Sequence, residues 1–79
     1  MTDFHAVLSQ IRAGQWDAAH AVVQEDDSPR AAWLHGILHI QERDLDNAAY
    51  WYRRAGRPFG DRGSVDEELA RFEAELPPS

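Results

Sequence analysis

Hydrophobic residues recur along the chain at positions three and four residues apart, in five separate stretches. Such spacing places the apolar side chains on one face of an α-helix. No stretch alternates between apolar and polar residues for long enough to make a strand. The pattern therefore predicts an all-α protein, with helices at about residues 4–13, 16–24, 29–42, 45–55 and 65–76.

Residues that favour helix ends lie at the borders of these stretches. Ser28 followed by Pro29 is typical of an N-cap and a first helical position. Ser64 and Glu67 have the spacing of a capping box. The other predicted caps are Thr2 and Asp44 at helix starts and Gly14 and Gly56 at helix ends. These borders divide a single domain, 1–79, into a first hairpin (1–27), a second hairpin (28–56), a loop (57–63) and a capping helix (64–76).

Two segments of the sequence match each other without gaps. The first is residues 13–23, AGQWDAAHAVV, and the second is residues 42–52, ERDLDNAAYWY. The turn residue Gly14 aligns with Arg43, and Ala19 aligns with Ala48 within a group of small residues in each segment. Alanines at such positions let two helices approach closely. The match indicates an internal repeat of a helical hairpin.

Residues 35–55, HGILHIQERDLDNAAYWYRRA, resemble the tetratricopeptide-repeat family in its Sel-like form. Gly36 stands where that family packs its two helices together, and His35 and His39 replace its usual leucine and tyrosine. The resemblance covers about residues 4–57. It implies two antiparallel helical hairpins in a right-handed, tetratricopeptide-like array, closed by a C-terminal capping helix. It also implies a module that binds other proteins, with the first helix of each pair lining the concave surface.

The composition limits the chemistry that the chain can carry. Without cysteine there are no disulfides, thiolate nucleophiles or zinc–sulfur sites, and without lysine there is no Schiff base. No apolar run approaches the roughly 18 residues that span a membrane. The early Asp3 and the lack of a basic region argue against a signal peptide at the start of the chain. We therefore expect a cytoplasmic protein with no membrane partner, and the exclusive use of arginine as the basic residue suggests a bacterial source.

The net charge is −6, with acidic ends around a basic middle. Residues 30–64 carry six arginines and four acids, whereas each flanking segment carries five acids and one arginine. Because phosphate neutralisation dominates nucleic-acid affinity, the overall charge argues against a nucleic-acid partner. The acidic face of residues 66–75 is interpreted as solvent-facing. Tyr50 and Arg54, four residues apart, are expected to make a local cation–π contact.

His35, His39 and Glu42 lie on one face of the third predicted helix and are the candidate metal ligands. Three ligands from one straight helix rarely converge on one ion. No glutamate follows the first histidine, as it does in the His-Glu-x-x-His enzymes. We therefore predict that His35 and His39 are packing residues between paired helices, and that the protein binds no metal or cofactor.

The third predicted helix is apolar on two flanks, because Trp33, Ile37 and Ile40 lie on one side and Leu34 and Leu38 on the other. Either the other helices cover both flanks, or part of the first flank faces a groove or a second subunit. The sequence leaves both possibilities open. In the second case, the predicted partner-binding residues are Trp33, Ile37, Ile40, Tyr50, Arg53, Arg54 and Arg57.

No serine has the setting of a catalytic nucleophile, and no glycine-rich phosphate loop is present, so an enzyme is not expected. The predicted function is a small protein-interaction module of the tetratricopeptide-like type, which binds a protein partner or a second copy of itself. Two alternatives stay open. One is a self-associating structural homodimer, and the other is a metal- or small-molecule-binding enzyme that uses His35 and His39.

Overall fold

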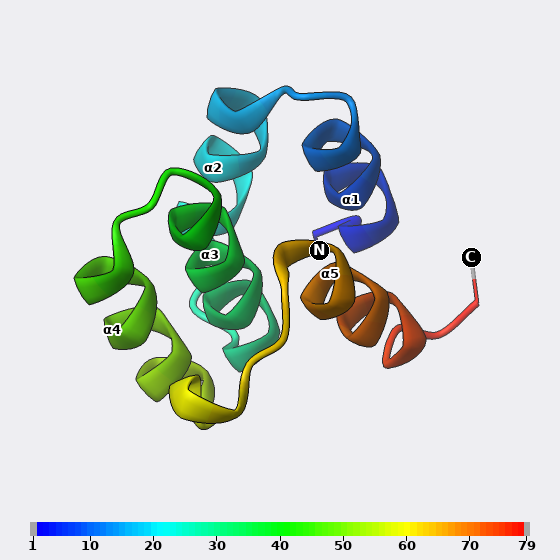
Figure 1. Ribbon diagram of the computed structural model, residues 1–79. Helices are drawn as coiled ribbons and strands as arrows, with labels where there is room; N and C mark the ends of the chain where they lie inside the picture. Colours follow the sequence, from blue (N-terminus) through cyan, green and yellow to red (C-terminus); the bar gives the residue numbers. More distant parts are fainter. Residues whose placement is uncertain (1, 79) are drawn as a thin grey trace.

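The structure is a computed structural model that describes residues 2–78 (Figure 1). Within this range it contains helices and no strand, so the all-α prediction is confirmed. The helices are α1 (Phe4–Arg12), α2 (Trp16–Gln24), α3 (Pro29–Gln41), α4 (Leu45–Ala55), the short 3-10 helix η1 (Phe59–Asp61) and α5 (Val65–Ala74).

Helix α3 lies at the centre of the molecule, with α4 on one side and α5 on the other (Figure 1). Helix α2 also packs on α3, and α1 packs on α2 and α5. Nine consecutive residues of α3, from Ala31 to His39, are buried. The chain's own helices therefore cover both apolar flanks of α3, which decides between the two possibilities that the sequence left open.

Most of the predicted caps are confirmed. Ser28 accepts a hydrogen bond from the backbone N–H of Ala31 at the start of α3, and Asp44 caps α4 in the same way. Ser64 and Glu67 form the complete capping box of α5. Helix α4 ends at Gly56, whose left-handed φ of 74° suits a residue without a Cβ.

The prediction of Thr2 as the first N-cap is wrong by one residue. The side chain of Asp3 accepts from the N–H of Ala6 and begins α1. Thr2 instead donates its hydroxyl hydrogen to the carboxylate of Asp26, 2.6 Å away. Both side chains can cap a helix, and the longer-range bond to Asp26 decides which one does.

The two aligned turns adopt the same backbone conformation. Gly14 has a φ of 80° and Arg43 has a φ of 64°, the only positive φ at a residue other than glycine within 2–78. The left-handed region is strained for a residue with a Cβ. Arg43 nevertheless has a left-handed backbone, because the turn between α3 and α4 has the same geometry as the turn between α1 and α2.

Helices α3 and α4 approach each other closely at Gly36. A Cβ added there would lie 2.5 Å from Cδ1 of Tyr52 and 3.2 Å from the carbonyl oxygen of Ala48. Ala48 and Tyr52 are both almost fully buried. The glycine is therefore required by packing, since its φ is an ordinary helical one.

Helix α5 closes the core from the other side. Its buried side chains are Glu68, Leu69 and Phe72. The ring of Phe72 lies 5.1 Å from the ring of Trp33 in α3 and 5.6 Å from that of Phe4 in α1, measured between centroids. Aromatic contacts of this kind add to the free energy gained by burial. The last helix is therefore a part of the fold and joins the start of α1 to the start of α3.

Candidate functional site

A cleft of about 1000 Å³ opens where α1 and α3 begin and α4 and α5 end. Its wall is mainly apolar. Pockets of this size with apolar walls and a few polar groups are the usual form of binding sites. The apolar lining residues are Phe4, Pro29, Trp33, Ala55, Leu76 and Pro77.

Trp33 forms the floor of this cleft and is held in place on several sides. Only 2% of its surface is exposed. Its indole N–H donates to Oε1 of Glu68 at 3.5 Å, and the guanidinium of Arg57 lies 3.4 Å from the centre of its ring. An incoming group therefore meets Arg57 first and reaches Trp33 only if that side chain moves aside.

Polar contacts along the rim of the cleft tie the two ends of the chain together. Arg57 forms an ion pair with Glu75 at 2.5 Å. His5 donates from Nε2 to the carbonyl oxygen of Pro77 at 2.8 Å. Arg30 makes a single long hydrogen bond of 3.4 Å to the carbonyl oxygen of Glu75. Arg30 is therefore an exposed arginine at the rim, beside the apolar wall, and its guanidinium makes only this one long hydrogen bond.

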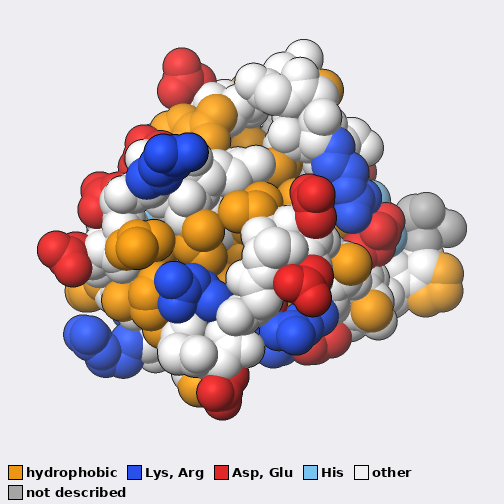
Figure 2. Space-filling view, viewed as in Figure 1, with side chains coloured by type: hydrophobic (Ala, Val, Ile, Leu, Met, Phe, Trp, Pro, Cys, Tyr) orange, Lys and Arg blue, Asp and Glu red, His pale blue; other side chains and the backbone are white. Residues whose placement is uncertain are grey.

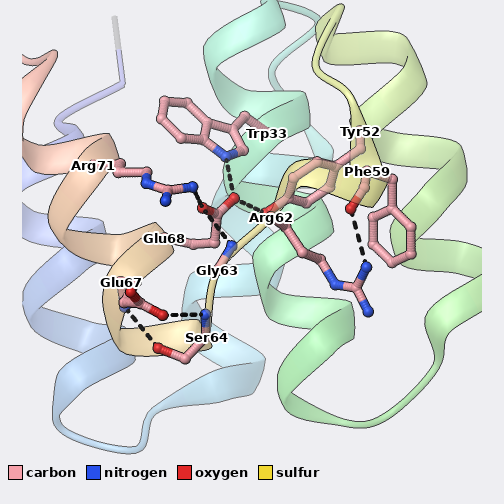
Figure 3. A network of polar contacts seen from close by, with 9 residues as sticks. All are labelled: Trp33, Tyr52, Phe59, Arg62, Gly63, Ser64, Glu67, Glu68 and Arg71. Atoms are coloured by element: carbon pink, nitrogen blue, oxygen red, sulfur yellow. Dashed lines mark hydrogen bonds and ion pairs between the residues drawn. The ribbon is translucent and has the colours of Figure 1, made fainter.

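A buried carboxylate, Glu68, supports the floor of the cleft from below (Figure 3). It is 3% exposed. Its oxygens accept hydrogen bonds from the hydroxyl of Tyr52 at 2.5 Å, the N–H of Gly63 at 3.3 Å and the guanidinium of Arg71 at 2.8 Å, besides that of Trp33. The network joins α3, α4 and α5 through one side chain. The prediction that the acidic face of 66–75 faces solvent is therefore wrong at Glu68.

The hydrogen bonds of this network stabilise the ionised form of Glu68. Burial alone would raise the pKa of Glu68, but the hydrogen bonds from Tyr52, Gly63 and Trp33, with the charge of Arg71, lower it overall. Burial and the bond to the carboxylate raise the pKa of Tyr52, so its hydroxyl stays a donor. A fixed carboxylate with a fixed donor is suited to holding structure and not to transferring protons.

A second candidate site is a cluster of three histidines between α2 and α3. His20 of α2 joins His35 and His39 of α3, and their candidate ligand nitrogens all lie within 4.8 Å of one another. The prediction that His35 and His39 are buried is confirmed, since 4% and 6% of their surfaces are exposed. Glu42 is exposed and accepts a hydrogen bond from Nδ1 of His39 at 2.5 Å.

The environment of the cluster keeps at least two of its rings neutral. Burial, followed by the nearby His20 and His39, lowers the pKa of His35 to about 4. Burial and the charge of His39 lower the pKa of His20, although Glu42 and Asp17 oppose this. At neutral pH the imidazoles of His20 and His35 are therefore uncharged, and each has a free lone pair on one nitrogen.

The structure separates the predicted partner-binding residues into different places. Trp33 and Ile37 are 2% and 0% exposed within their own chain, so the flank that they share is not an open partner surface, although Trp33 also lines the cleft. They are buried because other helices, α5 among them, pack on α3. Ile40 is partly buried against the core.

The remaining predicted residues lie on or beyond α4. Tyr50 is 43% exposed, and Arg53 and Arg54 are exposed beside it. The guanidinium of Arg54 lies 5.9 Å from the ring centre of Tyr50 and donates to its hydroxyl at 3.1 Å, so the predicted local contact is confirmed. Only Arg57 reaches the cleft.

Figure 2 shows the face seen in Figure 1, where hydrophobic side chains gather over α4 and α3 between scattered arginines and acids.

Among residues 2–78, no helix is both long and apolar enough to cross a membrane. None of the known family models, curated proteins or solved structures matches this chain. The resemblance to tetratricopeptide repeats therefore stays a prediction based on the sequence pattern.

Proposed function

We propose that this protein is a small helical interaction module that binds a segment of another protein in the cleft at the start of α3. The observation that carries the proposal is the apolar wall of that cleft, about 1000 Å³ in volume, on a domain of only 79 residues. The floor of the cleft is preformed, because contacts with Glu68 and Phe72 fix Trp33, and only the side chain of Arg57 has to move to uncover it. A preformed site lowers the entropy cost of binding.

The charges at the rim indicate the chemistry of the bound segment. The cleft is also lined by three carboxylates, and each of them has a partner: Glu75 pairs with Arg57, Asp3 accepts from the N–H of Ala6, and Asp26 accepts from Thr2 and Ser28. Arg30, in contrast, makes only the long bond to a backbone carbonyl. A guanidinium binds a carboxylate well, with two parallel hydrogen bonds. The best ligand is therefore a short apolar segment that carries an aspartate, a glutamate or a free C-terminal carboxylate beside its apolar side chains.

We further propose that the α3–α4 hairpin is a tetratricopeptide-type unit and that α1–α2 is a diverged copy of it. Two observations support this. The close approach of α4 to Gly36 is what the family resemblance implies for that position. The turns at Gly14 and Arg43 have the same left-handed conformation at aligned positions.

The test is selection of peptides from a displayed random library on the full chain. We expect the selected peptides to combine apolar residues with an acidic group. Their affinity should fall several-fold for Arg30→Glu and stay unchanged for Arg53→Glu, a matched charge reversal on the exposed side of α4. Equal effects of the two substitutions, or peptides without a common pattern, would argue against the cleft as the binding site.

Sedimentation at several protein concentrations distinguishes partner binding from self-association. A monomer at all concentrations, with peptide binding at the cleft, supports the interaction module. A concentration-dependent dimer that Arg30→Glu disrupts and Arg53→Glu does not would mean that the cleft binds a second copy of this chain.

A further inference from the structure

We propose that His20, His35 and His39 bind one divalent transition-metal ion, with Glu42 holding His39 in orientation. The three side chains come from two helices, and their ligand nitrogens already lie within 4.8 Å of one another. Imidazole is a good ligand for Zn²⁺, Ni²⁺ and Cu²⁺. This site is separate from the cleft and does not depend on the function proposed for it.

The contribution from α2 is what makes a metal site geometrically possible. A single straight helix presents its ligands along one line, whereas His20 approaches His35 from the side, with ring centroids 4.6 Å apart and planes at 88°. In a tetrahedral zinc site with bonds of about 2.0–2.1 Å, neighbouring nitrogens lie roughly 3.3 Å apart. Side-chain rotations can close the remaining gap, because His20 is only partly buried.

The surroundings of the cluster resemble those of an imidazole metal site. A histidine that binds a metal usually donates its other N–H to a carboxylate, and Nδ1 of His39 donates to Glu42 at 2.5 Å. That bond leaves Nε2 of His39 for the ion. Nδ1 of His35 is buried and has no hydrogen-bond partner within residues 2–78. A buried polar atom without a partner costs free energy, which makes it a marker of a missing ligand or ion.

Two tryptophans stack on rings of the cluster. Trp16 stacks on His20 with centroids 4.7 Å apart, and Trp51 stacks on His35 at 3.9 Å. The indole N–H of Trp16 in turn donates to the carbonyl oxygen of Leu38 at 2.8 Å. The three imidazoles supply three ligands, so the fourth position of a zinc ion is left for water or for a group from outside.

The experiment is a calorimetric titration of the full chain, without a histidine tag and after removal of metal by a chelator, with Zn²⁺. We expect one ion per chain with micromolar affinity or tighter, and a change in tryptophan fluorescence because Trp16 and Trp51 stack on ligand rings. Glu42→Gln should lower the affinity roughly 10–100-fold. His20→Asn, which removes a ligand, should lower it further.

The control is His5→Asn, because His5 is the one histidine of the chain that lies outside the cluster. It should bind Zn²⁺ as the parent does. Circular dichroism of each variant shows whether it folds, and the exposed Glu42 provides a variant that keeps the core intact if His20→Asn does not fold. The proposal is overturned if the parent binds no Zn²⁺ at 100 micromolar protein, or if Glu42→Gln and folded His20→Asn bind it like the parent.

Discussion

Replacing Gly36 with alanine tests how closely α3 and α4 pack. The added Cβ would lie 2.5 Å from Cδ1 and 2.8 Å from Cε1 of Tyr52. Carbon atoms in contact are normally about 3.5–4.0 Å apart. The ring of Tyr52 must therefore move by about 1 Å, or the hairpin must open.

Neither movement is free of cost. The hydroxyl of Tyr52 is bonded to Glu68 at 2.5 Å, and its ring packs edge-on against Phe59 with centroids 5.2 Å apart. Overpacking a core costs typically 1–3 kcal/mol, and a Cβ at 2.5 Å from a held ring belongs to the upper part of that range, about 2–3 kcal/mol. Alanine gains about 1 kcal/mol over glycine within a helix, which offsets part of this cost. We expect the free energy of unfolding to fall by about 1–2 kcal/mol, which lowers the melting temperature of a domain of this size by roughly 5–15 °C.

The assay is thermal and urea unfolding of Gly36→Ala followed by circular dichroism, with Gly60→Ala as the control. A Cβ at Gly60 would meet no atom within 4 Å, so that variant should stay within about 0.5 kcal/mol of the parent. The sign of the change in the free energy of unfolding of Gly36→Ala shows whether packing or helix propensity dominates at this position. An unchanged or higher melting temperature would mean that helix propensity outweighs packing and that the approach of α4 to α3 is looser than described.

Three other substitutions give further expected outcomes. Arg43→Gly should raise the free energy of unfolding by about 1 kcal/mol, because it relieves a φ of 64°, and urea unfolding measures this. Glu68→Gln should lower it by about 1.5–3 kcal/mol through loss of charge-assisted hydrogen bonds, whereas Glu73→Gln on the exposed face of α5 should change it little. In the presence of a chelator, the free energy of unfolding of the parent should fall by up to about 3 kcal/mol as the pH falls from about 6.5 to 4. Over this range His35 binds a proton in the unfolded chain, whereas in the folded protein it does so only near its lowered pKa of about 4. In His35→Phe, which keeps an aromatic ring against Trp51, this loss should largely disappear from urea unfolding curves measured across that range.

Local signals in the sequence predicted the helices and most of their ends. Ser28 with Pro29, the Ser64 capping box and Gly56 each act on backbone groups within a few residues, so their effect is visible without the fold. The error at Thr2 arose because Asp26, which binds it, is 24 residues away in the sequence. The sequence left open for the same reason whether the flank that carries Trp33 and Ile37 is covered, since only the packing of the other helices on α3 shows that it is.

The candidate site depended on contacts that no local pattern shows. His20 joins the histidine cluster because α2 packs on α3, although its sequence neighbours suggest only an ordinary helix. Glu68 is one of five acids in the last segment, and the sequence does not distinguish it from the others. One signal could have identified it. Trp33 and Tyr52 both carry donors that need partners when buried, and Arg71 follows Glu68 at the spacing of a helical ion pair.

The most direct test of the interaction module is an amide NMR titration of the isotope-labelled full chain with a peptide selected on it. The account predicts saturable shift changes at the start of α1, the start of α3 and the end of α5, around Arg30 and Leu76. Residues on the exposed side of α4, such as Tyr50 and Arg53, should not respond. Shift changes centred on α4, with the cleft residues unmoved, would contradict the assignment of the cleft as the binding site.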